Sequence, residues 1–328
     1  MPPNPSERSS ESPSHDPVHP PLSSAHEPHG PDGPHGPREP SAPELRIPDP
    51  ELEISQPLAP VSSSTPPAAV DDLGELTCDP ILRGRLRLWQ PRYGYRFSVD
   101  PLLLADFTLG PGEAAEREPL GQIADLGAGV GIVGLALAAA DPAARVTLVE
   151  LQPRLAALCR KNLVENALTE RCQVVQGDVL AVPTRRLLPG AGFDLVVSCP
   201  PYYPLGRGGL NPGSEEAIAR HELRLPLGEL VRASRRLIGF RGRVTLVYPS
   251  PRLAELLSAL VQSGLQPSRL RLVHPRPGEP AQRVLVEACK GSRGALVIEP
   301  PLFLRDAAGA YTKEARRALG EPARSEPA

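Results

Sequence analysis

Short apolar runs alternate with amphipathic stretches from about residue 120 to residue 290. The runs have the length of buried strands, and the stretches between them repeat apolar residues at helical spacing. We expect strands at 122–127, 145–151, 172–178, 193–198 and 242–248, with helices at 132–140, 153–168, 226–238 and 251–264. Alternating strands and helices predict a mostly parallel, doubly wound α/β sheet.

Two later apolar runs, 268–275 and 282–290, are joined by the stretch PRPGEPA without an intervening helix. Such a pair favours an antiparallel hairpin at the end of the sheet. The expected architecture is therefore a seven-stranded, mostly parallel sheet with an antiparallel terminal hairpin. Ligands of doubly wound sheets bind beyond the carboxyl ends of the strands, so the chemistry is expected just after the first four strands.

The first expected strand ends in the glycine-rich stretch DLGAGVG, which contains Asp125, Gly127, Gly129 and Gly131. Glycines at alternate positions allow a tight turn that a ligand can approach closely, although tight geometry alone explains such a turn equally well. The spacing differs from the G-x-G-x-x-G of dinucleotide sites. Gly134 nevertheless keeps a nicotinamide enzyme as an alternative.

Acidic residues follow the next two expected strands. Glu150 stands where a ribose diol needs a hydrogen-bond acceptor, and Asp178 stands where an acceptor suits an adenine amino group. Taken singly, each acid also fits a solvated carboxylate or a helix cap. In this order, the glycine turn and the acids resemble the S-adenosylmethionine site of class I methyltransferases. The resemblance implies a Rossmann-like fold with S-adenosylmethionine as cofactor.

The fourth expected strand ends in VVSCPPYY, residues 196–203. Methyltransferases that act on planar amino groups are similar here, because they carry Asn, Asp or Ser before Pro-Pro and an aromatic residue. A delocalised amine attacks a methyl group poorly unless hydrogen-bond acceptors hold its hydrogens. The resemblance implies that the catalytic residues are Cys199, Pro200, Pro201 and Tyr202, with Tyr202 stacking on the target base and no metal required.

Cys199 departs from that motif, and a thiol accepts hydrogen bonds only weakly. A backbone carbonyl could suffice for slower catalysis, the substrate could differ, or the protein could bind the cofactor without turnover. Cys199 also fits a small buried residue with no chemical role. We expect methyl transfer to be retained.

Three further segments resemble the bacterial family that methylates N6 of an adenine in a valine tRNA. They are GYRFSVDPLLLADF at 94–107, ARHEL at 219–223 and LVIEPPLFLRDAAGAYTKEARRAL at 296–319. The resemblance covers about residues 80–320 and implies a tRNA, or another structured RNA, as the partner. It also implies that Phe97 and Asp100 border the cofactor or substrate entrance, whereas a core aromatic and a helix cap are the plain alternatives.

Two other functions stay open. One is N5-methylation of a glutamine side chain in a protein, whose amide nitrogen has the same delocalised lone pair. The other is a protein that binds S-adenosylmethionine or RNA without catalysis. RNA contact is expected from a basic and aromatic cluster, although a strand with arginines on its wet face explains the same pattern. The cluster consists of Arg83, Arg85, Arg87, Trp89, Arg92, Tyr93, Tyr95 and Arg96.

Composition separates the first residues of the 328-residue chain from the rest. Residues 1–70 hold 19 of the 43 prolines, with ten acidic residues against three arginines. A segment of this kind cannot bury enough apolar surface to fold. We expect a disordered acidic Pro/Ser/His-rich tail at 1–75, the methyltransferase domain at 76–320 and a flexible end at 321–328.

The five cysteines are widely spread and include no C-x-x-C pair, which favours a reduced, cytosolic setting over disulfides or a metal site. The first residues lack the pattern of a signal peptide. The longest apolar run, 132–140, is too short to span a bilayer. No membrane or metal partner is therefore expected. The sequence leaves the oligomeric state open, with a monomer favoured.

Overall fold

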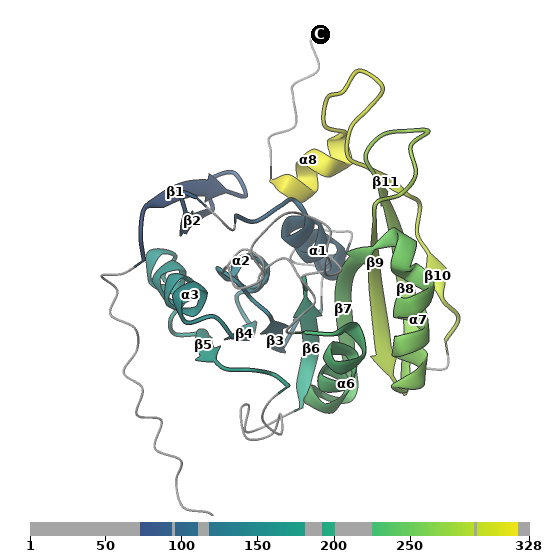
Figure 1. The fold of residues 1–328 in the computed structure, drawn as a ribbon, viewed down its shortest axis with the longest axis horizontal. Coiled ribbons are helices and arrows are strands. Elements are labelled where there is room, and N and C mark those ends of the chain that lie inside the picture. Colours follow the sequence, from purple (N-terminus) through teal and green to yellow (C-terminus); the bar gives the residue numbers. More distant parts are fainter. Residues whose placement is uncertain are drawn as a thin grey trace, which may run out of the picture. The chain divides into compact units, whose positions relative to one another are not determined.

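The computed structural model describes residues 73–93, 96–110, 118–180, 192–200, 225–291 and 294–320 (Figure 1). All of them belong to one compact unit that spans Ser63–Ala328. Most of the expected tail lies outside the described residues, and so does the expected flexible end after 320. The three expected segment boundaries stay predictions.

Strands and helices alternate as the sequence predicts. The main strands are β3 (Gln122–Leu126), β4 (Arg145–Glu150), β5 (Cys172–Gln176), β6 (Phe193–Ser198), β7 (Ile238–Pro249), β8 (Leu265–His274) and β9 (Arg283–Lys290). The short strands are β1 (Leu76–Ile81), β2 (Leu86–Pro91), β10 (Val297–Ile298) and β11 (Leu302–Phe303). The helices are α1 (Asp100–Leu109), α2 (Ile132–Ala140), α3 (Pro153–Glu165), α6 (Leu227–Leu237), α7 (Leu253–Gln262) and α8 (Lys313–Leu319), and a 3₁₀ turn, η4 (Ser250–Arg252), precedes α7.

Strands β1 and β2 form a separate two-stranded sheet, and the other described strands form one large mixed sheet in the order β10-β8-β9-β7-β6-β3-β4-β5, with β11 also paired to β8. Strands β7, β6, β3, β4 and β5 are parallel to one another. Strand β9 is antiparallel to both β7 and β8. The seven expected strands and the antiparallel hairpin are therefore confirmed. The two-residue strands β10 and β11 lengthen the sheet to nine strands, which the sequence did not predict.

Helices cover both faces of the sheet, so its central strands are buried on both sides. Along β3 and β6, Ile123 and Leu195 join the core cluster that contains α1, α2 and α3. Their neighbours Ala124 and Val196 join the second cluster, which contains α6 and α7. This alternation is what the two-residue period of a strand produces. It explains why the sequence shows continuous apolar runs here.

The hairpin of β1 and β2 lies beside α3, as Figure 1 shows. In β2, Leu86 and Leu88 are buried whereas Arg87 between them is exposed, so the strand has a wet face. The buried Asn162 amide of α3 donates to the Trp89 and Val130 carbonyls and accepts from the Trp89 backbone N–H. One side chain thus ties the hairpin to the segment that begins α2.

None of the helices in the described ranges is long and apolar enough to cross a membrane. The five cysteines are free thiols. Burial raises the pKa of the Cys159 thiol well above its usual value, and burial also raises that of Cys172. These two thiols are therefore expected to be unreactive.

Candidate active site

The glycine turn after β3 adopts a backbone conformation that favours glycine. Gly127, Gly129 and Gly131 have φ angles of 70°, 59° and 93°. The N–H groups of Gly127 and Ala128 both donate to the carbonyl of Val149, at 2.9 and 3.0 Å. The turn is therefore fixed to the carboxyl end of β4, and a side chain is missing at Gly127, its half-buried position, where close approach is possible.

Packing, as well as the φ angle, requires glycine at two positions of this region. A Cβ atom at Gly131 would lie 2.6 Å from Leu135 Cδ1 and 2.7 Å from Cys159 Sγ. A Cβ atom at Gly134, inside α2, would lie 2.8 Å from Leu148 Cδ2 of β4. Gly134 is thus explained by close contact between a helix and the sheet, and no dinucleotide is needed to account for it.

Asp125 is buried beneath the turn and supports the first part of α2. Its Oδ2 atom accepts from the Gly134 N–H at 2.9 Å. Burial raises the pKa of the Asp125 carboxyl to about 7, and the nearby Glu150 carboxylate adds to the rise while the Gly134 hydrogen bond opposes it. The observed contact holds α2 in place, and direct contact of Asp125 with the cofactor stays a prediction.

The Glu150 carboxylate is only 5% exposed and holds two backbone groups. Oε2 accepts from the Gly129 N–H at 2.7 Å, and Oε1 accepts from the Gln152 N–H at 2.8 Å. Glu150 therefore holds the glycine turn to the segment that begins α3. At the end of β5, Asp178 is half-buried and accepts from the Leu180 N–H at 2.8 Å.

These groups lie in line along one edge, because β3, β4 and β5 are adjacent and parallel. A glycine turn that is half-buried at Gly127 comes first, followed by the carboxylate of Glu150 and then by that of Asp178. The residues present therefore fit a nucleoside with a ribose diol, such as the S-adenosyl group of the expected cofactor.

On the other side of β3, β6 ends in the proline segment. The Ser198 hydroxyl is fully buried and donates to the Leu126 carbonyl at 2.6 Å, which joins the ends of β6 and β3. Cys199 is half-buried and packs against the core, and Pro200 is buried. The proline segment thus begins directly beside the glycine turn. Pro201 and Tyr202 lie outside the described residues, as does the ARHEL segment.

Asp100 forms a buried ion pair that sequence reasoning missed. Its Oδ2 atom accepts from Arg283 Nε at 2.9 Å, with the Asp100 side chain 6% exposed. The N-cap of α1 is Val99, without a side-chain cap hydrogen bond, so the cap interpretation of Asp100 is wrong. Arg283 pairs with Pro249 at the end of β7, which places the ion pair at the same edge as the proline segment.

The expected basic cluster on the hairpin is largely neutralised by the protein itself. Its ion pairs are Arg87 with Glu165, Arg92 with Glu75, and Arg96 with Asp79. Arg85 donates to the Ala139 carbonyl, and Trp89 Nε1 donates to Glu165. The alternative of a strand with arginines on its wet face therefore describes β2. Phe97 is half-buried against the core, as a core aromatic would be.

Comparison of the chain with known proteins identifies a family that has this kind of site. The family model called Methyltransferase small domain matches residues 113–207, a range that includes the glycine turn, both acids and the start of the proline segment. The tRNA1(Val) (adenine(37)-N6)-methyltransferase of Porphyromonas gingivalis strain ATCC 33277 is 32% identical over 219 residues, which are 64% of this chain and 84% of the relative. The chain belongs to this methyltransferase family.

Further matches are also methyltransferases by description. A protein of the same description from Aeromonas hydrophila is 32% identical over 54% of this chain and 74% of its own length. Among solved structures, Atu636 of Agrobacterium tumefaciens, described as a predicted O-methyltransferase, is 28% identical with a TM-score of 0.53 and covers 70% of this chain and 100% of its own. The protein is therefore a class I methyltransferase with a Rossmann-like fold and S-adenosylmethionine as its cofactor.

Proposed function

We propose that the protein transfers a methyl group to N6 of an adenine in tRNA, in the cytosol. The observation that carries the proposal is the position of Cys199 and Pro200, at the carboxyl end of β6 and directly beside the glycine turn of β3. The family relatives are named for this activity, and the chain covers 84% of one of them. Five free thiols support a reducing compartment.

Each part of the site has a role in this proposal. The half-buried backbone at Gly127 and the carboxylate of Glu150 would hold the nucleoside part of the cofactor, and Asp178 would accept from its adenine. S-adenosylmethionine supplies an electrophilic methyl group when it is bound. The contribution of this chain is then to bind the target amine close to that group and in line with it, because positioning alone can supply much of the acceleration.

The amine of adenine is delocalised into its ring, so acceptors at its hydrogens matter. Ser198 cannot be such an acceptor in place of Cys199, because its hydroxyl is buried and committed to Leu126. The thiol of Cys199 accepts only weakly. The backbone carbonyls of the Cys199–Pro200 segment are therefore the stronger acceptors, and the rigid proline ring holds them in place.

The proposal is tested by mass spectrometry of nucleosides from purified tRNA of cells with and without the gene. We expect N6-methyladenosine to be lost from one tRNA and restored by the wild-type gene. The variant Glu150→Gln should not restore it, whereas Arg145→Ala should, because Arg145 is exposed at the amino end of β4. If deletion changes no tRNA nucleoside, the proposed substrate is wrong, and labelled methyl transfer to protein becomes the next measurement.

A further inference from the structure

Two stretches of chain beyond the carboxyl end of β8 form a surface that the known function does not explain. We call it the C-terminal platform, and it consists of residues 274–281 and 303–313. Strand β8 runs parallel to β7, because both are antiparallel to β9. The carboxyl ends of β6, β7 and β8 therefore lie on one edge of the sheet. The platform follows the end of β8 and thus stands on the same edge as Cys199 and Pro200.

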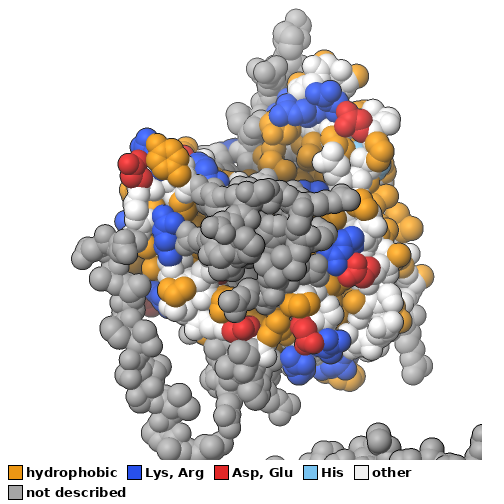
Figure 2. All heavy atoms as spheres, viewed as in Figure 1, with side chains coloured by type: hydrophobic (Ala, Val, Ile, Leu, Met, Phe, Trp, Pro, Cys, Tyr) orange, Lys and Arg blue, Asp and Glu red, His pale blue; other side chains and the backbone are white. Residues whose placement is uncertain are grey.

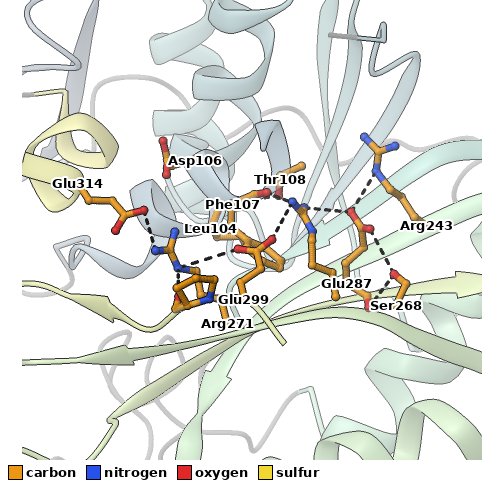
Figure 3. A network of polar contacts seen from close by, with 12 residues as sticks. Leu104, Asp106, Phe107, Thr108, Arg243, Ser268, Arg271, Glu287, Glu299 and Glu314 are labelled. Atoms are coloured by element: carbon orange, nitrogen blue, oxygen red, sulfur yellow. Dashed lines mark hydrogen bonds and ion pairs between the residues drawn. The ribbon is translucent and has the colours of Figure 1, made fainter. Parts of the chain in front are cut away.

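A network of polar contacts ties β8 to the first turn of α8, the helix that directly follows the platform (Figure 3). Arg271 of β8 donates to Glu314 of α8 at 2.6 Å and to the Pro300 carbonyl at 3.0 Å. One turn further along α8, Arg317 pairs with Asp106 of α1 at 3.0 Å and also lies 3.9 Å from Glu314. Helix α8 is therefore tied both to the sheet and to α1. The loop that enters α8 is anchored at its end.

The loops of the platform are ordered from within. Arg305 donates to the Gly309 carbonyl at 2.8 Å and lies over the ring of Tyr311, 4.2 Å from its centroid. The Nδ1 atom of His274 lies 2.8 Å from the Glu279 carbonyl, within hydrogen-bond distance. Side chains that are held before binding lose little conformational freedom when a partner arrives. The platform is therefore pre-organised.

Two cations of the platform differ from those of the hairpin. The side chains of Arg276 and Lys313 are exposed, and neither makes a hydrogen bond or ion pair with another residue in the described ranges. The carboxylates on the platform are those of Glu279 and Asp306, and Asp306 accepts from the Ala310 N–H. In Figure 2, Lys and Arg side chains gather at the top of the view, over α8 and the loop before it.

We propose that the C-terminal platform docks the phosphate backbone of the RNA substrate, through Arg276, Arg305 and Lys313. The inference rests on the proposed function, because it assumes that RNA reaches the edge of the sheet beside Cys199. Cations carried on anchored loops at that edge suit a folded RNA whose target base enters the site while its backbone lies outside. The hairpin, where Arg87, Arg92 and Arg96 are paired with carboxylates, would contribute less.

The test is binding of an unmodified tRNA1(Val) transcript at several KCl concentrations, measured by fluorescence anisotropy. The variant is R276A/K313A, and the matched control is R145A/R241A, which removes two exposed arginines near the amino ends of β4 and β7. The logarithm of the binding constant falls linearly with the logarithm of the salt concentration, and each phosphate contact on a single strand adds about 0.7 to the steepness of that line. One such contact therefore contributes a factor of roughly five to the affinity at 0.1 M salt compared with 1 M salt. We therefore expect R276A/K313A to bind roughly 25-fold more weakly at 0.1 M salt, with a slope smaller by about 1.4.

Calorimetry with S-adenosylmethionine should give equal affinities for both double variants, because neither touches the glycine turn or Glu150. If the wild type binds and methylates the transcript but R276A/K313A binds it like R145A/R241A, the platform is not the docking surface and the proposed function stands. If the wild type neither binds nor methylates the transcript, both proposals are wrong.

Discussion

Substitution of Gly131 by alanine tests the geometry of the glycine turn directly. Gly131 has a φ angle of 93°, and its added Cβ would meet Leu135 and Cys159 at less than 3 Å. An alanine in the left-handed region costs about 1–2 kcal/mol. Forcing a methyl group into a packed core costs about 1–3 kcal/mol more. We therefore expect Gly131→Ala to lower the free energy of unfolding by about 2–5 kcal/mol.

Gly84 separates the two contributions. It has a φ angle of 76°, at the tip of the β1–β2 hairpin, and a Cβ there would meet nothing within 4 Å. Gly84→Ala therefore carries the backbone cost alone, about 1–2 kcal/mol. The difference between the two variants isolates the packing around Gly131. Removal of the Cys159 thiol by Cys159→Ala should restore part of the stability of Gly131→Ala, because residues in contact do not act additively.

The assay is urea unfolding of each variant without ligand, together with calorimetry of S-adenosylmethionine binding. Gly131→Ala should also bind the cofactor at least about tenfold more weakly, since a displaced turn needs to lose only about 1.4 kcal/mol for that effect. Gly84→Ala should bind it as the wild type does. Equal stabilities for the two alanine variants, with equal cofactor affinities, would refute the reasoning.

Three further predictions use single side chains of the site and its supports. Cys199→Asn should raise the methylation rate at saturating RNA without changing cofactor affinity, and an unchanged or lower rate would mean that the backbone carbonyls already suffice. The raised pKa of Asp125, about 7, means that its carboxylate destabilises the fold as pH rises from 4 to 8, by up to about 4 kcal/mol. Asp125→Asn should remove this pH dependence of the free energy of unfolding. The same pH dependence in the variant and the wild type would contradict a raised pKa for Asp125. Asn162→Leu removes the side-chain partner of one buried and two half-buried backbone groups and should cost about 3 kcal/mol. The half-exposed Asn166→Ala should cost less than about 1 kcal/mol in the same unfolding assay.

Most of the fold could be predicted because strand and helix periods are local properties of the chain. The exceptions have identifiable causes. The helix expected at 153–168 ends at Glu165, since the Asn166 amide bonds the backbone of Arg87 and Ala167 has a positive φ angle. Strand β7 begins at Ile238, four residues before the expected start, where its pairing with β6 shifts register. Both effects depend on a distant partner strand.

The site was predictable to the same extent. The glycines and acids could be placed because each follows a recognisable strand, and the parallel order of the strands then brings them together. The ion pair of Asp100 with Arg283 joins positions 183 residues apart, and no local pattern announces such a partner. The arginine cluster of the hairpin predicts a basic surface, but the sequence does not show which carboxylates the fold places beside these arginines.

The same argument bears on Cys199, which a motif comparison marks as a defect. The structure shows that the segment is aligned by Ser198, one residue earlier, whose buried hydroxyl joins the ends of β6 and β3. Cys199 follows the last residue of β6 and is half-buried against the core. The position of the proline segment beside the glycine turn is therefore set in part by Ser198 and by the pairing of β6 with β3. Substitution of Cys199 should change the rate of transfer while leaving the alignment intact.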